Sequence, residues 1–397
     1  MLQNNSTALE AVRQLSGAEI LEKIKKAGLY SAGAEAEPVA DMLVPCTCIA
    51  GALNNADCDG VLADIAALNP AGVIAGLLAA CKAAGAERAE LLLPESRAAL
   101  KDRLLDTAKQ AGLALTVEIS DMADVRAHKA DVFVHLVTLA AVAELFTGGQ
   151  PAAVLFVDGN LRELPFGAPL RTLFPAEGAR AVCINHHFYA SSILDEALKP
   201  DFALGSGVLR VLGDNDCVVK ATRDELMALR QKSCGKCLFC REGLYQLTTI
   251  FGEMTEAHAK AADPDLAVEI GEAMRVSAAC TLGKTAGEPA VSTCVLFRDE
   301  VDSHVKGKSC PSGECKAFLT LYIDPALCQG SGECMAVCPA DCIEGKNGFI
   351  SMIDTFACIK CGKCVDACPE NAVKYAGGSR LPSLPERLTR VGRFRRR

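Results

Sequence analysis

Three cysteines at every third position, Cys234, Cys237 and Cys240, form the most informative pattern in this sequence. A C-x2-C-x2-C run can bring three thiolates to one side of a compact turn, as the corners of an iron-sulfur cube require. Cys280 is a candidate for the fourth ligand. The alternative is a zinc site, but three thiolates are packed more tightly here than in the usual paired zinc arrangement. We therefore expect a [4Fe-4S] cluster on these four cysteines.

A second set of possible ligands, His304, Cys310 and Cys315, falls within twelve positions. Three nitrogen and sulfur ligands this close fit a structural zinc site that lacks its fourth member. Cys294 is a possible fourth ligand. The other interpretation is two free thiols on a linker, and the sequence favours neither.

Composition limits the classes of function. The 397 residues suggest two to four domains, and 21 cysteines without a secretory signal indicate metal ligation in a reducing cytoplasm. The formal net charge of −8 argues against nucleic acid as the main partner. The longest apolar stretch, residues 132–146, is interrupted by His135 and Glu144, so we expect no membrane span.

The elements that position these residues begin with an alternation of helices and strands. Ser16 and Glu19 form a capping-box pattern, and Asn69 with Pro70 starts a helix that ends near Gly85. We expect a helix from Ser96 to about Ala111, and strands over 90–93, 113–119 and 131–137. This alternation is typical of a layered α/β domain.

Two further features have weaker signals. His186 and His187 fall in an expected loop without a nearby acidic partner in sequence, which favours a surface position. The basic tail over 379–397 is expected to be solvated or disordered, with docking on an acidic partner as the alternative.

The opening motif also carries a family resemblance. S-C-G-K-C-x2-C-R-E-G followed by C-x-L-G resembles the cluster-binding region of the NADH-oxidising flavoprotein subunit of respiratory complex I. The related subunits of soluble, often electron-bifurcating, hydrogenases and formate dehydrogenases share it. The resemblance implies that Cys234, Cys237, Cys240 and Cys280 ligate one [4Fe-4S] cluster in a helical bundle.

The chain departs from that family where flavin and nucleotide would bind. The family has a glycine-rich loop for the FMN phosphate, and the corresponding residues 28–39 lack its arginines and carry Glu35 and Glu37. Negative charge repels a phosphate, because such loops work by exposing backbone N–H groups to an anion. The family's acidic nucleotide-binding stretch is also absent from 45–55. We therefore expect the flavin site to be lost and FMN to be absent.

Residues 319–375 resemble a bacterial two-cluster ferredoxin module, in which the fourth cysteine of each run serves the other cluster. The resemblance implies one cluster on Cys338, Cys358, Cys361 and Cys364. It implies a second cluster on Cys328, Cys334 and Cys368, with Ser331 where a cysteine is expected. The fourth corner is empty, which gives [3Fe-4S], or is taken by Ser331 or by Cys342.

These observations predict a multidomain α/β and α+β chain with six segments. They are a degenerate Rossmann-like flavin and NADH-type domain (1–150), a β-grasp, SLBB-like domain (151–221), a helical [4Fe-4S] domain (222–303), a linker with a possible metal site (304–318), a two-cluster ferredoxin domain (319–378) and a basic tail (379–397).

The function expected from this organisation is electron relay in a cytoplasmic oxidoreductase complex. Its partners would be other redox subunits of flavoprotein, hydrogenase or formate dehydrogenase type. One alternative is an active FMN-dependent NAD(P)H-oxidising subunit. The other is a mainly structural docking subunit.

Overall fold

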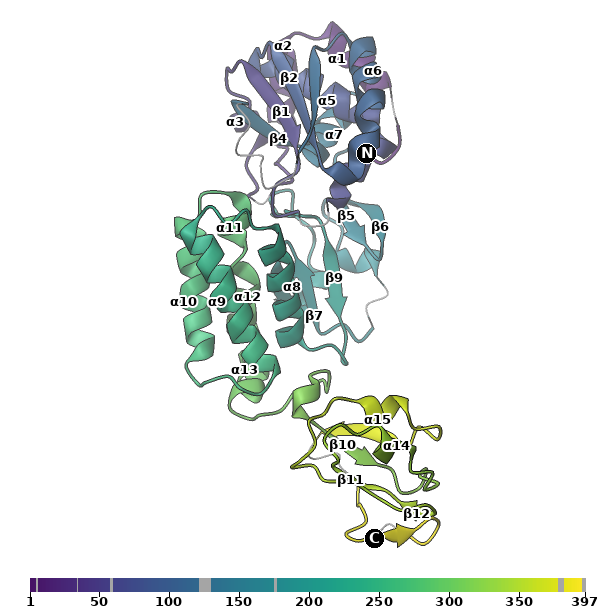
Figure 1. The fold of residues 1–397 in the computed structure, drawn as a ribbon. Helices are drawn as coiled ribbons and strands as arrows, with labels where there is room; N and C mark the ends of the chain where they lie inside the picture. The colour runs from purple at the N-terminus through teal and green to yellow at the C-terminus, as the bar shows by residue number, and fades with distance from the viewer. Residues whose placement is uncertain are drawn as a thin grey trace. The chain divides into compact units, whose positions relative to one another are not determined.

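The computed structural model describes residues 1–4, 6–33, 35–57, 60–120, 130–174, 177–377 and 382–394 (Figure 1). Contacts between residues divide the chain into two compact units. The first comprises Met1–Asp214, Asp224–Thr248 and Asp265–Leu296, and the second comprises Asn215–Arg223, Thr249–Pro264 and Phe297–Arg397. Both units are discontinuous because three helices begin in one unit and end in the other, namely Val218–Lys232, Leu238–Thr255 and Asp263–Ser277.

The first unit begins with a parallel sheet of four strands in the order β3-β2-β1-β4. The strands are β1 (Cys48–Ala52), β2 (Arg88–Leu93), β3 (Leu115–Ile119) and β4 (Val132–His135). The chain runs outward from β1 through β2 to β3 and then returns to place β4 on the other side of β1. The carboxyl ends of β1 and β4 therefore lie side by side where the strand order reverses, the usual location for a ligand in such sheets.

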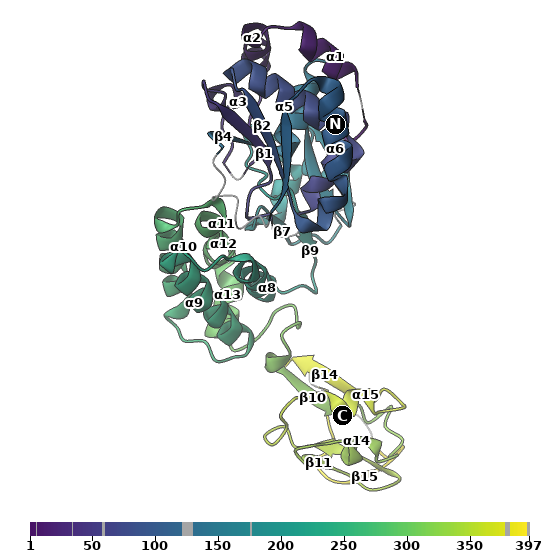
Figure 2. The ribbon, with the colours of Figure 1, turned by 45° about the horizontal axis from the view of Figure 1, so that its top comes forward.

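Helix α5 (Pro70–Ala84) is the centre of this α/β layer (Figures 1 and 2). It packs against five helices: α1 (Thr7–Gln14), α2 (Gly17–Ala27), α4 (Asp64–Leu68), α6 (Lys101–Ala111) and α7 (Leu136–Glu144). The predicted cap is confirmed, since the Asn69 carboxamide oxygen accepts the Gly72 N–H at 2.8 Å and Gly85 is left-handed. A Cβ at Gly76 would lie 1.8 Å from the Leu139 carbonyl oxygen, so only glycine allows α5 and α7 to approach so closely.

Several expected boundaries are confirmed and others shift. The capping box of Ser16 and Glu19 is present at the start of α2. The strand expected over 131–137 ends at His135, because the His135 ring accepts the Val137 N–H and caps α7. The helix expected from Ser96 starts as a 3-10 turn at Glu95–Leu100 before α6. Short elements complete the layer: α3 (Val39–Met42), η1 (Val61–Ala63) and α4 (Asp64–Leu68).

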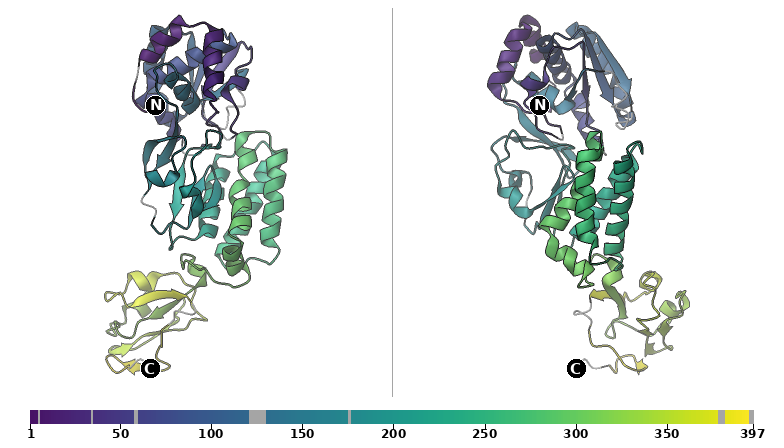
Figure 3. Two further views of the ribbon diagram at one scale, coloured as in Figure 1. Left: turned by 180° about the vertical axis from the view of Figure 1, so that it is seen from behind. Right: turned by 90° about the vertical axis from the view of Figure 1, so that its left-hand side faces the viewer.

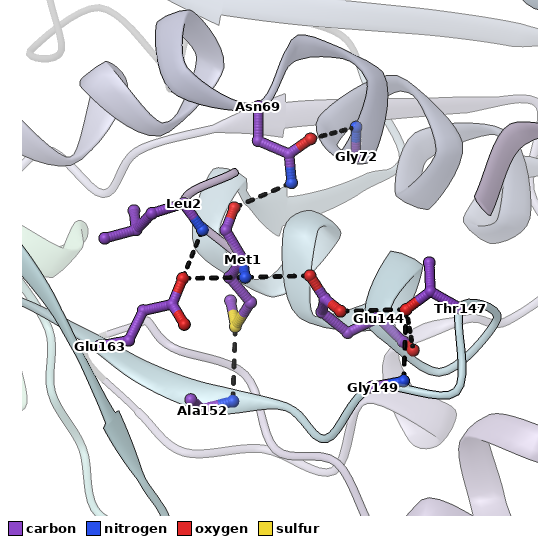
Figure 4. Close-up of polar contacts among 9 residues, drawn as sticks. All are labelled: Met1, Leu2, Asn69, Gly72, Glu144, Thr147, Gly149, Ala152 and Glu163. Atoms are coloured by element: carbon purple, nitrogen blue, oxygen red, sulfur yellow. Dashed lines mark hydrogen bonds and ion pairs between the residues drawn. The ribbon is translucent and has the colours of Figure 1, made fainter. Parts of the chain in front are cut away.

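The α-amino group of Met1 lies inside this unit between two carboxylates (Figure 4). It is 2.9 Å from a Glu144 carboxylate oxygen and 2.8 Å from a Glu163 carboxylate oxygen. The Met1 carbonyl accepts a hydrogen bond from the Asn69 side chain at 2.8 Å. These contacts join the first residue to α7, to the cap of α5 and to strand β6 (Asn160–Pro165).

Two small sheets follow in the first unit. A hairpin pairs β5 (Ala152–Val157) with β6 (Asn160–Pro165) through Asp158 and Gly159, which both have positive φ, as tight hairpin turns require. A three-stranded antiparallel sheet has the order β8-β7-β9. Its members are β7 (Ala181–Ile184), β8 (His187–Ala190) and β9 (Leu209–Leu212), with 3-10 turns η4 (Leu170–Leu173) and η5 (Ser191–Asp195) beside them.

Six helices follow the small sheets, and the first cysteine motif lies among them. They are α8 (Val218–Lys232), α9 (Leu238–Thr255), α10 (Asp263–Ser277), α11 (Thr281–Thr285), α12 (Glu288–Leu296) and α13 (Arg298–Val305). Gly271 and Gly287 allow α10 and the residue that precedes α12 to approach closely, since a Cβ at Gly287 would lie 2.6 Å from the Gly271 Cα. Figure 3 gives two further views of these helices. No single described helix is both long and apolar enough to cross a membrane; only the bent pair Val61–Leu68 and Pro70–Ala84 passes that length and composition test.

The end of the second unit is a small domain with matching halves. Strand β10 (Leu319–Ile323) pairs antiparallel with β14 (Val373–Gly377), and short helices α14 (Glu333–Ala336) and α15 (Lys363–Asp366) occupy equivalent places. The remaining elements are η6 (Lys316–Phe318), β11 (Ile343–Glu344), β12 (Phe349–Ile350), β13 (Met352–Ile353) and β15 (Thr389–Arg390).

The tail differs from expectation. Strand β15 pairs antiparallel with β12, and Val391 and Phe394 pack against the core of this small domain. The Arg390 guanidinium lies 5.7 Å from the Phe349 ring centroid. The basic tail therefore contributes a strand and apolar contacts where a solvated segment was expected. Residues 378–381 and 395–397 fall outside the described residues.

Candidate iron-sulfur and metal centres

The first cysteine motif lies between the end of α8 and the start of α9 (Figure 1). Cys234 and Cys237 are in the connecting turn, and Cys240 is buried in the first turn of α9. Cys280 is the N-cap residue of α11. A Cβ at Gly283 would lie 2.6 Å from the Ala278 Cβ and 3.5 Å from the Cys240 Cβ. The glycine in C-x-L-G thus allows α11 to pack directly beside Cys240.

The four thiols of this motif are neighbours. Burial raises the pKa of the Cys240 thiol, and the charges of Cys280, Cys237 and Cys234 raise it further. The Ser233 hydroxyl lies 3.4 Å from the Cys240 sulfur. The four thiols are not among the described groups close enough to share a single ion. Sulfurs that are farther apart than the ligands of a single ion fit the corners of an iron-sulfur cube, and this spacing disfavours the zinc alternative.

The ferredoxin-like domain brings together its second run. A small cavity of about 10 Å³ is lined by the four thiols that the resemblance assigns to one cluster, namely Cys338, Cys358, Cys361 and Cys364. Burial raises the pKa of the Cys364 thiol to about 11, with smaller contributions from neighbouring thiolates. This donor set fits a [4Fe-4S] cluster, since all four are thiols around one enclosed space.

The other three thiols of the domain are also neighbours. Burial raises the pKa of the Cys334 thiol, and the charges of Cys328 and Cys368 add to the shift. Ser331 is exposed and precedes Gly332, the N-cap of α14, just as Cys361 precedes Gly362, the N-cap of α15. Ser331 therefore occupies the position that corresponds to a ligand in the other half.

Cys342 lies among the thiols that the resemblance assigns to the other cluster. Its sulfur lies 3.4 Å from the Cys338 sulfur, and it lines the same cavity as Cys358. Burial and a hydrogen bond with Cys338 raise the pKa of its thiol to about 12. The contacts of Cys342 are thus with thiols that the resemblance assigns to the other cluster.

The second unit contains a compact set of four ligands. Cys217, His304, Cys310 and Cys315 have ligand atoms within 4.8 Å of one another. The sequence candidates His304, Cys310 and Cys315 are brought together, but the fourth member is Cys217 and not Cys294. Cys217 lies just before α8, 87 positions upstream of His304, so no local spacing could reveal it.

The dimensions of this set fit a tetrahedral ion. Zinc bonds of about 2.3 Å to sulfur and 2.0 Å to nitrogen give edges of roughly 3.8 Å between sulfurs and 3.5 Å between sulfur and nitrogen. The Cys217 sulfur lies 3.6 Å from the Cys315 sulfur and 3.3 Å from His304 Nε2. His304 Nδ1 donates to the Glu300 carbonyl at 2.8 Å. That bond commits Nδ1 as a donor, so Nε2, which faces the Cys217 sulfur, is the atom that would bind a metal.

The three thiols of the set differ in their pKa, because hydrogen bonds among the sulfurs and burial raise the pKa of Cys217 and Cys315, while hydrogen bonds lower that of Cys310. A hydrogen bond from Cys217 holds the pKa of the Cys310 thiol far below its usual range. Burial alone would lower the pKa of His304, but hydrogen bonds with Cys217 and Cys310 raise it to about 10. His304 is fully buried, and the Phe318 ring meets its edge at 5.1 Å between centroids. The site is therefore enclosed, and Cys310 is the thiol that is already biased towards the thiolate form that binds metal.

His186 was expected at the surface, and that expectation is wrong. The side chain is 4 % exposed, with Nδ1 2.5 Å from a Glu225 carboxylate oxygen and Nε2 2.7 Å from the Ala56 carbonyl oxygen. Each ring nitrogen thus faces an oxygen atom. Arg210 donates to the other Glu225 oxygen at 2.6 Å. His187 also has an acidic partner, Glu288, at 3.1 Å.

Residues 28–39, which the resemblance relates to the family's phosphate loop, pair several of their backbone N–H groups with acceptors inside the protein. Ser31 N–H donates to the Glu37 carbonyl at 2.8 Å, Ala32 N–H to the Thr138 hydroxyl at 2.8 Å, and Gly33 N–H to the Ser31 hydroxyl at 3.2 Å. Three successive donors that could face an anion are thus paired within the protein.

Comparisons with known proteins agree with these centres. Residues 220–304 match the NADH-ubiquinone oxidoreductase-F iron-sulfur binding region, and residues 320–369 match the 4Fe-4S dicluster domain. The resemblance expected from the cysteine motif is thereby confirmed. The chain contains two 4Fe-4S binding regions.

Two curated relatives match part of the chain. The NADP-reducing hydrogenase subunit HndC of Solidesulfovibrio fructosivorans is 39% identical over 142 residues, which cover 36% of this chain and 29% of HndC. The F-type subunit of the NADH-quinone oxidoreductase of Mycobacterium tuberculosis (strain ATCC 25618 / H37Rv) is 34% identical over 108 residues, covering 27% and 24%. The matches thus span less than a third of either relative.

A solved structure shares the mixed α/β fold. The structure of NAD+-reducing [NiFe]-hydrogenase in the H2-reduced state matches with a TM-score of 0.66 and 18% sequence identity. The match covers 76% of this chain and 65% of that chain. At this identity the likeness concerns the fold alone.

Proposed function

We propose that this chain is an iron-sulfur electron-transfer subunit of an oxidoreductase complex, relaying electrons between partner subunits without a flavin or NADH site of its own. The observation that carries the proposal is the pairing of the N–H groups of Ser31, Ala32 and Gly33 within the protein. A phosphate at that loop would need to break these bonds and approach Glu35 and Glu37. The two 4Fe-4S binding regions are retained in the same chain.

Iron-sulfur clusters supply one-electron transfer when bound, and the chain's residues hold and tune them. Three groups of thiols would hold three clusters. Nearby hydroxyls, such as Ser233 beside Cys240, donate hydrogen bonds to sulfur and so shift the reduction potential. Several clusters in one chain suit a relay, because each needs an electron donor and an electron acceptor. The partners we propose are redox subunits of flavoprotein, hydrogenase or formate dehydrogenase type.

The domain organisation that goes with this function is a proposal too. It keeps the degenerate flavin-type layer over 1–150, the β-grasp, SLBB-like part over 151–221, the helical cluster domain over 222–303 and the ferredoxin domain over 319–378. The segment 304–318 would bind structural zinc through His304, Cys310 and Cys315, with Cys217 as the fourth ligand. The tetrahedral dimensions and the second hydrogen bond of His304 support zinc.

Cofactor content and activity test the proposal. Protein purified anaerobically should contain iron and sulfide, no stoichiometric flavin, and no NADH-oxidising activity by itself. A Cys237→Ala variant should lose about four irons and one EPR signal, because one cluster loses a ligand. One FMN per chain in an acid extract would support an active NAD(P)H-oxidising subunit instead. Clusters that exchange no electrons with any reconstituted partner would point to a docking subunit.

A further inference from the structure

Helix α11 begins at a residue whose side chain is a proposed iron ligand. Cys280 is the N-cap residue of α11, and its side chain makes no capping hydrogen bond. An N-cap side chain usually accepts the N–H of the second or third helical residue, because the first N–H groups of a helix have no partner within it. A sulfur that binds iron is not available for this role. The buried N–H of Leu282, the second residue of α11, therefore needs another acceptor.

Asn55 supplies that acceptor from a distant part of the chain. Its side-chain oxygen accepts the Leu282 N–H at 2.8 Å, across 227 positions. The Asn55 side chain is buried, and both residues belong to the first compact unit. This hydrogen bond is the one that a capping side chain would make, so Asn55 takes the place of the Cys280 side chain at the start of α11.

The segment that carries Asn55 is held by hydrogen bonds on both sides of it. The Asn54 side-chain oxygen accepts the Ala56 N–H at 3.0 Å, and the Asn54 carbonyl accepts the Asp57 N–H at 3.1 Å. His186 Nε2 lies 2.7 Å from the Ala56 carbonyl oxygen. These bonds fix the backbone from which the Asn55 side chain reaches α11.

His186 makes its contact from an unusual backbone conformation. Asn185 and His186 form the two-residue connection between β7 and β8, with φ of 51° and 65°. Such turns favour glycine at the second position, because a side chain is strained in the left-handed region. His186 occupies this position and bonds the Ala56 carbonyl and the Glu225 carboxylate with its ring. The hairpin thus uses a strained residue to hold the segment of Asn55.

We propose that Asn55 is a positioning residue for the first iron-sulfur cluster: by holding the Leu282 N–H, it leaves the Cys280 sulfur free for iron and keeps a hydrogen-bond donor away from that sulfur. This rests on the proposed cluster of the first cysteine motif. Hydrogen bonds to ligand sulfur stabilise the added negative charge of a reduced cluster and raise its reduction potential. Asn55 therefore keeps the reduction potential of this cluster lower than it would be if the N–H were released to the sulfur.

Redox titration followed by EPR tests the proposal on anaerobically purified full-length protein. The signal of this cluster is the one that Cys237→Ala loses, which identifies it among the signals of the other clusters. Asn55→Ala removes the acceptor and releases the Leu282 N–H to the Cys280 sulfur. At a fixed solution potential, the ratio of reduced to oxidised cluster should rise about tenfold, which for one electron corresponds to a positive shift of about 59 mV.

Two further variants separate the acceptor from the rest of the side chain. Asn55→Ser keeps a polar group, but its hydroxyl is closer to the backbone and does not reach the Leu282 N–H, so the ratio should rise as it does with alanine. Asn55→Asp keeps the acceptor and adds negative charge, so the ratio should not rise. Asn54→Ala is the matched control, because it removes a hydrogen bond within the same segment but none to α11. Its ratio should stay close to that of the wild type.

Each result decides for or against the proposal. An unchanged ratio in both Asn55→Ala and Asn55→Ser, a rise in Asn55→Asp, or an equal rise in Asn54→Ala would overturn it. Loss of about four irons from the alanine and serine variants, with retention in Asn55→Asp, would support it, because the acceptor would then decide whether Cys280 binds iron. Loss of the iron from all three variants at position 55 would show that Asn55 serves the fold as a whole, and the proposal would be wrong.

Failure of the proposed function is seen separately, before any variant at position 55 is made. Wild-type protein without the EPR signal of this cluster would contradict the cluster itself. A wild type with the signal and variants with unchanged potentials would leave the electron-transfer function intact and remove only the role of Asn55.

Discussion

Cys217 offers the sharpest test of the structure, because the sequence alone suggested a different cysteine as a possible fourth ligand. Cys294 was the candidate fourth ligand beside His304, yet Cys217 has the sulfur that lies 3.3 Å from His304 Nε2. The test compares Cys217→Ser with Cys294→Ser. Both cysteines are buried, so the two substitutions place a hydroxyl in similar surroundings and differ in access to the proposed metal.

The size of the effect follows from the number of ligands. Structural zinc sites with four ligands bind with about 10–16 kcal/mol at neutral pH. An equal share for one ligand is roughly 3 kcal/mol, which corresponds to a loss of affinity of about 10²- to 10³-fold. Serine keeps the shape of the side chain, but its hydroxyl is a harder and less acidic donor than a thiol. Cys217→Ser should therefore release zinc to a chelator that leaves the wild type loaded.

The assay is metal analysis of anaerobically purified full-length protein before and after dialysis against that chelator. Wild type and Cys294→Ser should retain about one zinc per chain, and Cys217→Ser should retain almost none. Iron content should stay the same in all three, which separates this site from the cluster thiols. Zinc retained by Cys217→Ser, or lost from Cys294→Ser alone, would show that the reasoning from the structure is wrong.

Three other results are expected. Exposure to air should convert the cluster beside Ser331 to [3Fe-4S] before the other clusters change, and the Ser331→Cys variant should resist this conversion. EPR follows the conversion, and equal rates in wild type and variant would contradict the prediction that the iron at position 331 is the most weakly held. Burial lowers the pKa of His135 from 6.5 to about 4, so the unfolded chain takes up a proton on this residue before the folded chain does as the pH falls. The free energy of unfolding should therefore drop by about 3 kcal/mol between pH 7 and pH 4. Chemical denaturation would measure this drop, and the His135→Phe variant should not show it. Glu225→Gln leaves the buried His186 ring without its carboxylate and should lower the free energy of unfolding by about 3–5 kcal/mol. Glu288→Gln, in the more exposed pair with His187, should lower it by under about 1 kcal/mol. Similar losses for both variants would show that burial does not set the strength of these pairs.

The local patterns of the sequence predicted local structure well. Helix ends at Ser16 and Asn69 depend on neighbouring residues, and the structure has both caps. The cysteine runs are local too, because three thiols at every third position can reach one cluster wherever the run is placed. Strand 131–137 was predicted too long because His135 uses its side chain to start a helix, which apolar periodicity does not record.

Side-chain charge and burial were harder to predict, because they depend on segments that are distant in the chain. His186 has its acidic partner 39 positions away on α8, and Glu225 has a lowered pKa although burial raises it, since His186 and Arg210 outweigh the desolvation. The tail forms β15 because β12 offers an edge to pair with, which the basic composition of the tail could not show.

The sequence by itself determined the chemistry of the clusters, since the cysteine runs identify the two 4Fe-4S binding regions. Only the tertiary structure decided which distant groups complete or disqualify a site. It brought Cys217 to His304 across 87 positions, placed Cys342 beside Cys338, and paired the N–H groups near Gly33 within the protein. The physical reason is that hydrogen bonds and metal ligation act over a few ångströms in space, and chain separation carries no information about that distance until the layers have packed.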